Sequence, residues 1–171
     1  EPVASEWTDL AATGALLRDA NRSLLFSLAV VDYTLEARPP GVSGAWDGTT
    51  TLNALDAAID HALSTFGDEL AAISFGNEVD RWLVKASPAA RTQMVALLQH
   101  AVAHAKALRP EVAAGVTLTS DAIVSGSPAE VTALAALGDV VIATYYPLDA
   151  NFHARPSSGA PADLDALVAA V

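Results

Sequence analysis

The chain has no cysteine among its 171 residues, so disulfide bonds and thiolate metal sites are excluded and the redox state of its compartment is not recorded. Lysine and arginine are scarce as well: nine stand against twenty aspartate and glutamate residues, a formal net charge of −11. This charge repels phosphate backbones and anionic membrane surfaces. We therefore expect neither nucleic acid nor a membrane as a partner.

Long apolar runs are also missing, because no stretch approaches the roughly 20 residues that span a bilayer. The sequence begins Glu-Pro-Val without an apolar leader, which is typical of a processed mature form or an excised fragment. Hydrophobic residues make up 52% of the chain, enough to bury one core. We expect a single domain over residues 1–171.

A regular alternation of helical and strand patterns is present. Four apolar runs have the length of buried strands: 24–32, 70–76, 112–119 and 140–146. Helical spacing or helix-capping signals occupy the segments around them: 5–20, 51–67, 88–109, 127–138 and 161–171. Strands that are apolar on both faces and joined by helices belong to a helix-covered parallel sheet, so the predicted fold class is α/β.

Two closures of such a sheet are open at this point. One is part of a (β/α)8 TIM barrel with about four βα units, and the other is an open, flavodoxin-like doubly wound sheet. Both place function at the carboxyl ends of the strands. The residues that follow the four runs are polar or aromatic, and the candidate site residues among them are Asp32, Tyr33, Asn77, Glu78, Asp121, Tyr145 and Tyr146.

Two long loops, 33–50 and 147–161, follow strands on the same side, and the first carries Trp46. An acidic mouth with aromatic side chains suits a neutral polyhydroxylated ligand, because sugar rings stack on aromatics and donate hydroxyls to carboxylates. We therefore expect an oligo- or polysaccharide as the partner. Trp46 is either a sugar platform or an anchor that packs its loop.

Three motifs are similar to parts of one enzyme family. The octapeptide "ISFGNEVD" (73–80) resembles the Asn-Glu pair that ends the fourth strand in the retaining glycoside hydrolases of clan A, which are (β/α)8 barrels. "TYYPLD" (144–149) looks like the sixth-strand signature of the endo-β-galactanases in that clan, and "VDYTLEARPPGVSGAW" (31–46) is similar to their third-strand segment. The resemblance covers strands three to six only.

The resemblance implies retaining hydrolysis of a β-linked polysaccharide, with Glu78 as acid/base and Asn77 on the sugar 2-hydroxyl. In that family the nucleophile ends the seventh strand, which would lie beyond this chain. We therefore expect a truncated, secreted (extracellular or periplasmic) domain that is inactive alone. The remaining expected substrate-binding residues are Asp32, Tyr33, Trp46, Asp121, Tyr145 and Tyr146. One of the two tyrosines is expected to face the cleft, because successive strand side chains alternate.

Other interpretations stay open beside the catalytic one. Gly-Asn-Glu after a strand is also typical of a turn whose carboxylate caps a helix, and Asp32 and Asp121 suit N-caps as well as partners of Glu78. A carbohydrate-binding or scaffold half-barrel without catalysis is the alternative function. An open α/β sheet that binds another small ligand is a third, although no glycine-rich phosphate loop follows any strand.

His100 and His104 have the i, i+4 spacing of a metal-binding pair. No further ligand motif accompanies them on their alanine-rich helix, so the pair is interpreted as a solvated helix flank. Neither a metal nor another cofactor is expected.

The two outer strands of a four-stranded piece of barrel would have unprotected edges. Residues 24–31 and 140–146 are strongly apolar and contain no lysine or proline that would block pairing with another chain. We therefore expect either a homodimer through these edges or strands that lie outside this sequence.

Overall fold

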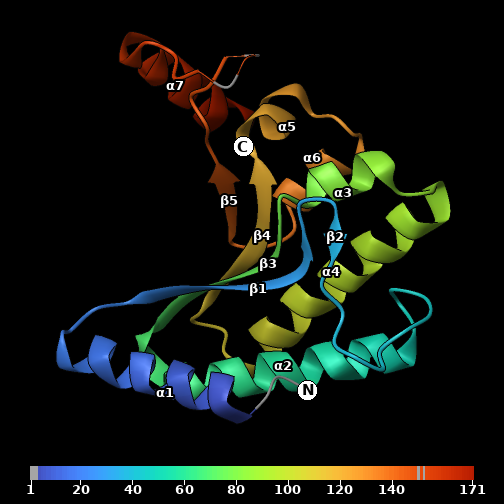
Figure 1. Ribbon diagram of the computed structural model, residues 1–171, viewed down its shortest axis with the longest axis vertical. Coiled ribbons are helices and arrows are strands. Elements are labelled where there is room, and N and C mark those ends of the chain that lie inside the picture. Colours follow the sequence, from blue (N-terminus) through green and yellow to red (C-terminus); the bar gives the residue numbers. More distant parts are fainter. Residues whose placement is uncertain (1–3, 150, 152) are drawn as a thin grey trace.

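A sheet of parallel strands forms the centre of the computed structural model, which describes residues 4–149, 151 and 153–171 (Figure 1). Its four parallel strands are adjacent in chain order: β1 (Leu24–Asp32), β3 (Leu70–Asn77), β4 (Ala113–Thr119) and β5 (Val140–Thr144). The short strand β2 (Leu35–Glu36) pairs antiparallel with the end of β1. The predicted α/β class is confirmed.

Helices connect the strands at the predicted places. The long ones are α1 (Ala4–Asp19), α2 (Thr49–Phe66), α4 (Pro88–Leu108) and α7 (Ala160–Ala170). The start of α4 follows from its sequence, because Ser87 Oγ accepts a hydrogen bond from the Ala90 N–H and proline occupies the first helical position. None of the helices in the described part of the chain combines the length and apolar composition that crossing a membrane requires.

The shorter elements differ from the sequence prediction. Helix α6 spans only Glu130–Ala135, and no side chain caps it, so the capping box predicted from Ser127 to Glu130 is wrong. Two short helices that were not predicted begin directly at strand ends: α3 (Val79–Lys85) after β3, and α5 (Ser120–Ser125) after β4. Two single 3-10 turns, Gly67–Glu69 and Ser157–Gly159, precede β3 and α7.

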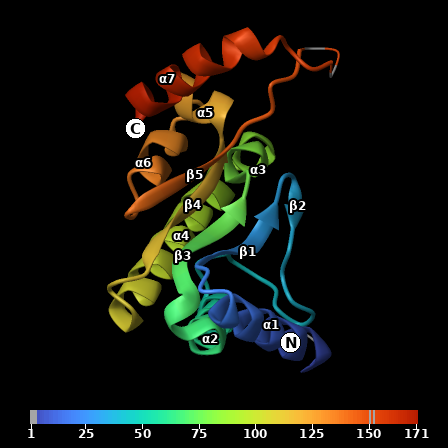
Figure 2. The same cartoon turned by 90° about the vertical axis from the view of Figure 1, so that its left-hand side faces the viewer.

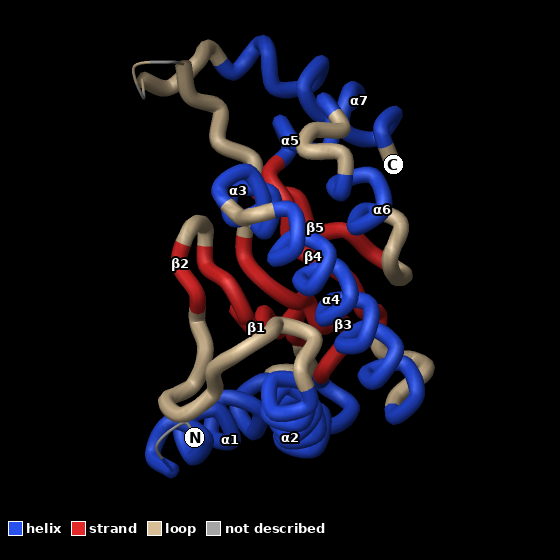
Figure 3. The backbone as a smooth tube through the Cα atoms, turned by 90° about the vertical axis from the view of Figure 1, so that its right-hand side faces the viewer, coloured by secondary structure: helices blue, strands red, loops and turns tan. Residues whose placement is uncertain are grey.

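The two faces of the sheet are unlike one another. On one face the ring of Phe26 lies 5.1 Å from that of Phe66 in α2, and Ile73 and Phe75, which pair with β1 on this face, are fully buried. Helices α2, α4 and α6 lie over this covered face (Figure 3). Leu25 points to the opposite, open face and is 49% exposed, and Figure 2 looks onto that face with α4 behind the strands.

The order of the described strands contains no reversal. A doubly wound sheet changes direction at a switch point where two neighbouring strands are not consecutive βα units. Here each parallel strand lies beside the next one along the chain, and the sheet bends strongly toward its open face (Figure 1). Beyond the two residues of β2, the edge of β1 carries no further strand, and β5 forms the other edge.

Candidate functional site

A cavity of about 620 Å³ lies at the carboxyl ends of the parallel strands, and we call it the cleft. All four strand ends contribute to its wall, which includes Tyr33, Glu78, Thr119, Asp121, Tyr146 and Asp149. A smaller cavity of about 80 Å³ lies between the sheet and α2 and has a largely apolar lining. The cleft is therefore a polar hollow at the end of the sheet where parallel α/β folds place their binding sites.

Glu78 sits where β3 passes into α3. Its backbone is left-handed, with φ 50° and ψ 50°, and the residue is only 6% exposed. Although Glu78 occupies the N-cap position of α3, its side chain makes no capping hydrogen bond. The helix-capping interpretation is therefore wrong for this carboxylate. Within the described part of the chain it forms no ion pair, and it lines the cleft.

Backbone strain is concentrated at the cleft. Three described residues other than glycine have positive φ: Asn21, Tyr33 at 56° and Glu78 at 50°. Asparagine tolerates this region, whereas a tyrosine or glutamate there is uncommon. Tyr33 and Glu78 both line the cleft. Strained backbone of this kind clusters at functional sites, so the observation points to the cleft independently of any motif.

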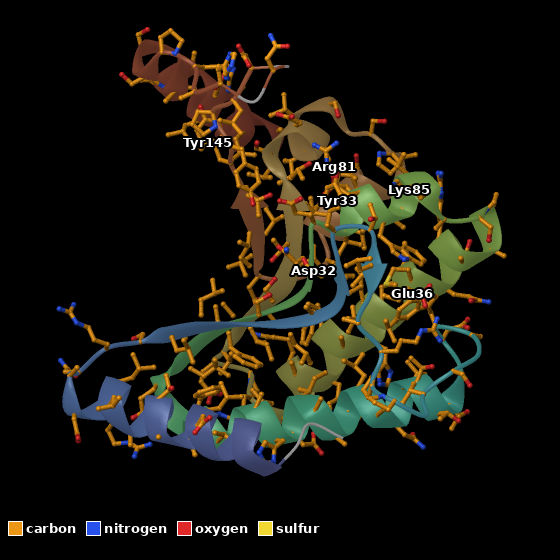
Figure 4. All side chains as sticks on the ribbon, in the orientation of Figure 1. Asp32, Tyr33, Glu36, Arg81, Lys85 and Tyr145 are labelled. Carbon is orange, nitrogen blue, oxygen red and sulfur yellow. The ribbon has the colours of Figure 1, made fainter. Side chains whose placement is uncertain are left out.

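Asn77 and Asp32 lie side by side at the ends of β3 and β1, where they are paired in the sheet register. The Asn77 side-chain N–H donates to Asp32 Oδ1 at 2.7 Å, and the backbone N–H of Tyr33 donates to the Asn77 carbonyl at 2.9 Å. Figure 4 shows Asp32, Tyr33 and Arg81 gathered at this end of the sheet. Asp32 therefore orients the amide of Asn77. It was considered as a partner of Glu78, and it is instead the partner of the residue before Glu78.

The two tyrosines after β5 point to different places, as the alternation of side chains predicts. Tyr146 lines the cleft, where the negative charge of Glu78 and a hydrogen bond with it raise the pKa of the phenol above its ordinary value of 10.0. Tyr145 instead donates to Asp163 Oδ2 at 2.6 Å, in a neighbouring hollow beside α7. Tyr146 thus meets Glu78, and Tyr145 does not.

Trp46 is not at the cleft. It is 3% exposed, its indole meets that of Trp82 edge to face at 5.5 Å, and the Arg38 guanidinium lies 3.6 Å from its ring centroid. A side chain buried in this way has no face free for a sugar. The structure therefore corrects the substrate-binding expectation for Trp46 in favour of the alternative, a loop anchor.

Asp121 is exposed on the first turn of α5 and lines the cleft. It is not the N-cap of that helix, because Thr119 Oγ1 takes this role and accepts from the Ala122 N–H. Its expected place at the site is thus retained, and its carboxylate is available to the cleft.

Two residues near the cleft were not among the predicted site residues. Asp80 is 2% exposed and accepts hydrogen bonds from the backbone N–H and the hydroxyl of Thr119, both at 2.8 Å, which ties α3 to the end of β4. Arg81 follows it and brings a positive charge into the cleft wall. Both lie in α3, which was not predicted from the sequence. The signal for Asp80 was its position among the polar residues after the second apolar run, and no comparable signal pointed to Arg81.

The cleft combines one largely buried carboxyl group, a phenol and further carboxylates at its rim, and the oriented Asn77 amide lies next to it in the chain, at the end of β3. Such a set can donate and accept protons and can bind the hydroxyls of a sugar. Across the described ranges, the group of three or more side chains that could hold a metal lies elsewhere, between α2 and α4. Comparisons of the chain with protein-family models, with curated proteins and with solved structures find no match.

Proposed function

We propose that the chain is the part from strand three to strand six of a retaining (β/α)8 glycoside hydrolase that acts on a β-linked polysaccharide outside the cytoplasm. Glu78 is its acid/base. The observation that carries this proposal is the Glu78 carboxyl, which a left-handed backbone holds at the carboxyl end of β3, facing the cleft without an ion-pair partner among the described residues.

The arrangement of the sheet supports the partial barrel. In a (β/α)8 barrel consecutive parallel strands are neighbours, the helices lie outside, and the strands curve around a filled interior. The consecutive order of β1, β3, β4 and β5, the helices over the covered face and the bend toward the open face all fit this plan. The open face then corresponds to the barrel interior.

The chemistry assigned to the cleft follows from the positions of its groups. In the first step a nucleophilic carboxylate forms a bond to the anomeric carbon, while the departing glycosidic oxygen takes the proton of Glu78. In the second step the Glu78 carboxylate removes a proton from water, which attacks the anomeric carbon and releases the nucleophile. The Asn77 amide, aligned by Asp32, binds a sugar hydroxyl. We assign the nucleophile to a strand outside this chain.

A carbohydrate-binding domain without catalysis is the second candidate. The lining of the cleft favours it, because Ser120 and Tyr146 supply hydroxyls and Asp121 supplies a carboxylate, groups that bind a sugar without any reaction. The two candidates share the ligand and differ in turnover. Under either candidate, the 171-residue chain alone binds oligosaccharides and does not cleave them.

Saturation-transfer NMR with β-linked galacto-, xylo- and gluco-oligosaccharides tests the ligand. We expect binding of at least one series, weakened about tenfold or more by Asn77→Ala, which removes one oriented hydrogen bond. Glu111→Gln is the matched control, since Glu111 pairs with Arg109 at the opposite end of β4. Absence of binding to all three series would contradict both candidates.

Release of reducing sugar from the corresponding polysaccharides tests the assignment of the nucleophile. We expect the chain to act no faster than its Glu78→Gln variant. Robust turnover that disappears in Glu78→Gln would show that a second carboxylate of this chain, such as Asp121 or Asp149, reaches the anomeric carbon. The glycosidase assignment would then stand, and the position of the nucleophile would be wrong.

The sheet edges make a second copy of the chain the proposed partner of the isolated protein. Strand β2 pairs with Val31 and Asp32, and the Ala37 N–H donates to the Val30 carbonyl. In the described part of the chain no strand pairs with this edge of β1 before Val30, or with the outer side of β5. We expect sedimentation at micromolar concentration to give a mass above 17.5 kDa, and Leu25→Lys to return it to that value. A stable monomer of the wild-type chain would contradict this proposal.

A further inference from the structure

Four side chains of metal-ligand type face one another across α2 and α4, on the side of the sheet away from its open face. Asp56 and Asp60 lie on α2, and His100 and His104 lie on α4. Each pair is four residues apart, so both of its members point from the same face of their helix. The two helices pack against each other (Figure 3). The short distances from Asp56 to His100 and from Asp60 to His104 place the aspartates and histidines in two facing rows.

The distances within this cluster are short. Asp56 Oδ1 lies 2.6 Å from His100 Nε2 and 3.7 Å from His104 Nδ1. One ligand atom from each of these three residues fits within 4.8 Å of the others. Tetrahedral zinc with bonds of about 2.0–2.2 Å spaces its ligand atoms roughly 3.3 Å apart. Small side-chain rotations therefore suffice to bring the three groups onto one ion.

Asp60 leaves the Nδ1 atom of His104 as the ring nitrogen that can bind an ion. Its Oδ1 lies 2.7 Å from His104 Nε2, so the ring nitrogen farther from Asp56 is the one that donates a proton to a carboxylate. In a neutral imidazole whose Nε2 carries the proton, Nδ1 keeps its lone pair. A histidine that binds a metal through one nitrogen and donates the other N–H to a carboxylate is a recurrent arrangement at zinc sites.

We propose that Asp56, His100 and His104 form a site for a divalent transition-metal ion, with zinc as the fitting example, a water molecule as the fourth ligand, and Asp60 as the residue that orients His104. Imidazole suits zinc, copper and nickel, whereas magnesium and calcium prefer oxygen ligands. Binding replaces the contact between Asp56 and His100, and the strongly negative protein favours a cation there.

The site is open to an ion from solvent. The side chains of Asp56, His104 and His100 are 27%, 25% and 37% exposed, so binding does not require the helices to separate. The ion would join α2 to α4 on the covered side of the sheet. Because it binds only the folded arrangement, it raises the free energy of unfolding, and the increase grows with the logarithm of the free ion concentration once this exceeds the Kd. This inference is independent of the function proposed for the cleft.

Calorimetric titration of the 171-residue chain with zinc, prepared without a polyhistidine tag, tests the site. We expect one ion per chain, a higher Tm in its presence, and the intense visible absorption of four-coordinate Co²⁺ when cobalt replaces zinc. His100→Gln and His104→Gln should abolish saturable binding. Asp60→Asn should weaken it about 10–100-fold, as loss of a carboxylate behind a metal-binding histidine does.

His153→Gln is the matched control, because His153 lies in the loop before α7 and outside the cluster. It should bind zinc like the wild type. Circular dichroism of each metal-free variant shows whether its helices are intact. The cobalt spectrum is recorded on the wild-type chain, so it tests the site even if a variant fails to fold. No saturable zinc binding by the wild type, or undiminished binding by both histidine variants, would overturn the proposal.

Discussion

The covered face of the sheet and the cleft are built from the same strands, but the first consists of apolar residues in regular strand conformation and the second of polar residues, two of them with left-handed backbone. On the covered face, Ile73 and Phe75 are fully buried in regular strand conformation. The regular strand conformation ends directly after Phe75. Gly76 has φ 76°, the Asn77 side chain donates a hydrogen bond to Asp32, and the backbone of Glu78 is left-handed. The regular part supplies stability, and the strained part presents polar groups. Stability and site chemistry should therefore respond to different substitutions.

Phe75→Ala gives the largest expected effect on stability. Phe75 is fully buried, so its truncation removes apolar contacts and leaves a cavity, at a cost of about 3–5 kcal/mol in the free energy of unfolding. Leu25→Ala on the open face, where the side chain is 49% exposed, should cost less than about 1 kcal/mol. Urea denaturation measures both, and similar losses would remove the distinction between the two faces.

Trp46→Ala tests the correction made for this residue. Its indole is buried against Trp82 and beneath Arg38, so we expect a loss of about 3 kcal/mol and no change in oligosaccharide binding. Tyr33→Ala is the counterpart in the cleft, because Tyr33 is 52% exposed and lines that cavity. Tyr33→Ala should weaken oligosaccharide binding with little effect on stability. If instead Trp46→Ala weakened binding and left stability unchanged, Trp46 would be a sugar platform after all.

Asp80→Ala tests the connection between core and cleft. The substitution leaves the Thr119 backbone N–H and hydroxyl without their acceptor in a buried position, and it should cost about 1–3 kcal/mol. Asp121→Ala, an exposed carboxylate of the same cleft, should leave stability within about 0.5 kcal/mol. Thermal unfolding compares the two. Equal stabilities would mean that Asp80 does not anchor α3 to β4.

The smallest effect is expected in the ionisation of Tyr146. Its pKa is raised by the charge of Glu78 and by their hydrogen bond, so the phenol should titrate above 10.0 in the folded chain. The folded state therefore holds this proton more tightly than the unfolded state. The resulting stability is complete below pH 10.0 and is lost as the pH rises through the raised value.

Ultraviolet difference titration measures this ionisation. Glu78→Gln should lower the pKa of Tyr146 toward its ordinary value, because the substitution removes the charge. Asp163→Asn is the control, since Asp163 raises the pKa of Tyr145 in the neighbouring hollow. If the pKa of Tyr146 were the same in Glu78→Gln, the Glu78 carboxylate would not be the cause of the raised value.

The strands could be predicted well because each is a continuous apolar run with the length of a buried strand, as in residues 24–32. The failures lie where local patterns have no tertiary context. Ser127 and Glu130 match a capping box, yet the helix begins only at Glu130. Likewise, Trp46 in a Gly- and Pro-rich loop is equally consistent with exposure and burial, and its packing on Trp82 decided the outcome.

The cluster between α2 and α4 shows a second kind of limit. His100 and His104 were noticed by their spacing, and Asp56 and Asp60 have the same spacing on the preceding long helix. Taken alone, either pair has the sequence pattern of the solvent-exposed side of a helix. Their meeting depends on the register between two helices separated by β3, which periodicity within one helix does not contain.

The left-handed backbone at Tyr33 and Glu78 has a consequence for protein engineering. A stabilisation programme that follows backbone rules alone would replace both residues with glycine, because each L side chain in this region costs about 1–2 kcal/mol. Such a programme would begin by erasing the cleft. The two positions that a design procedure would mark as errors are thus the two that a search for activity should leave untouched.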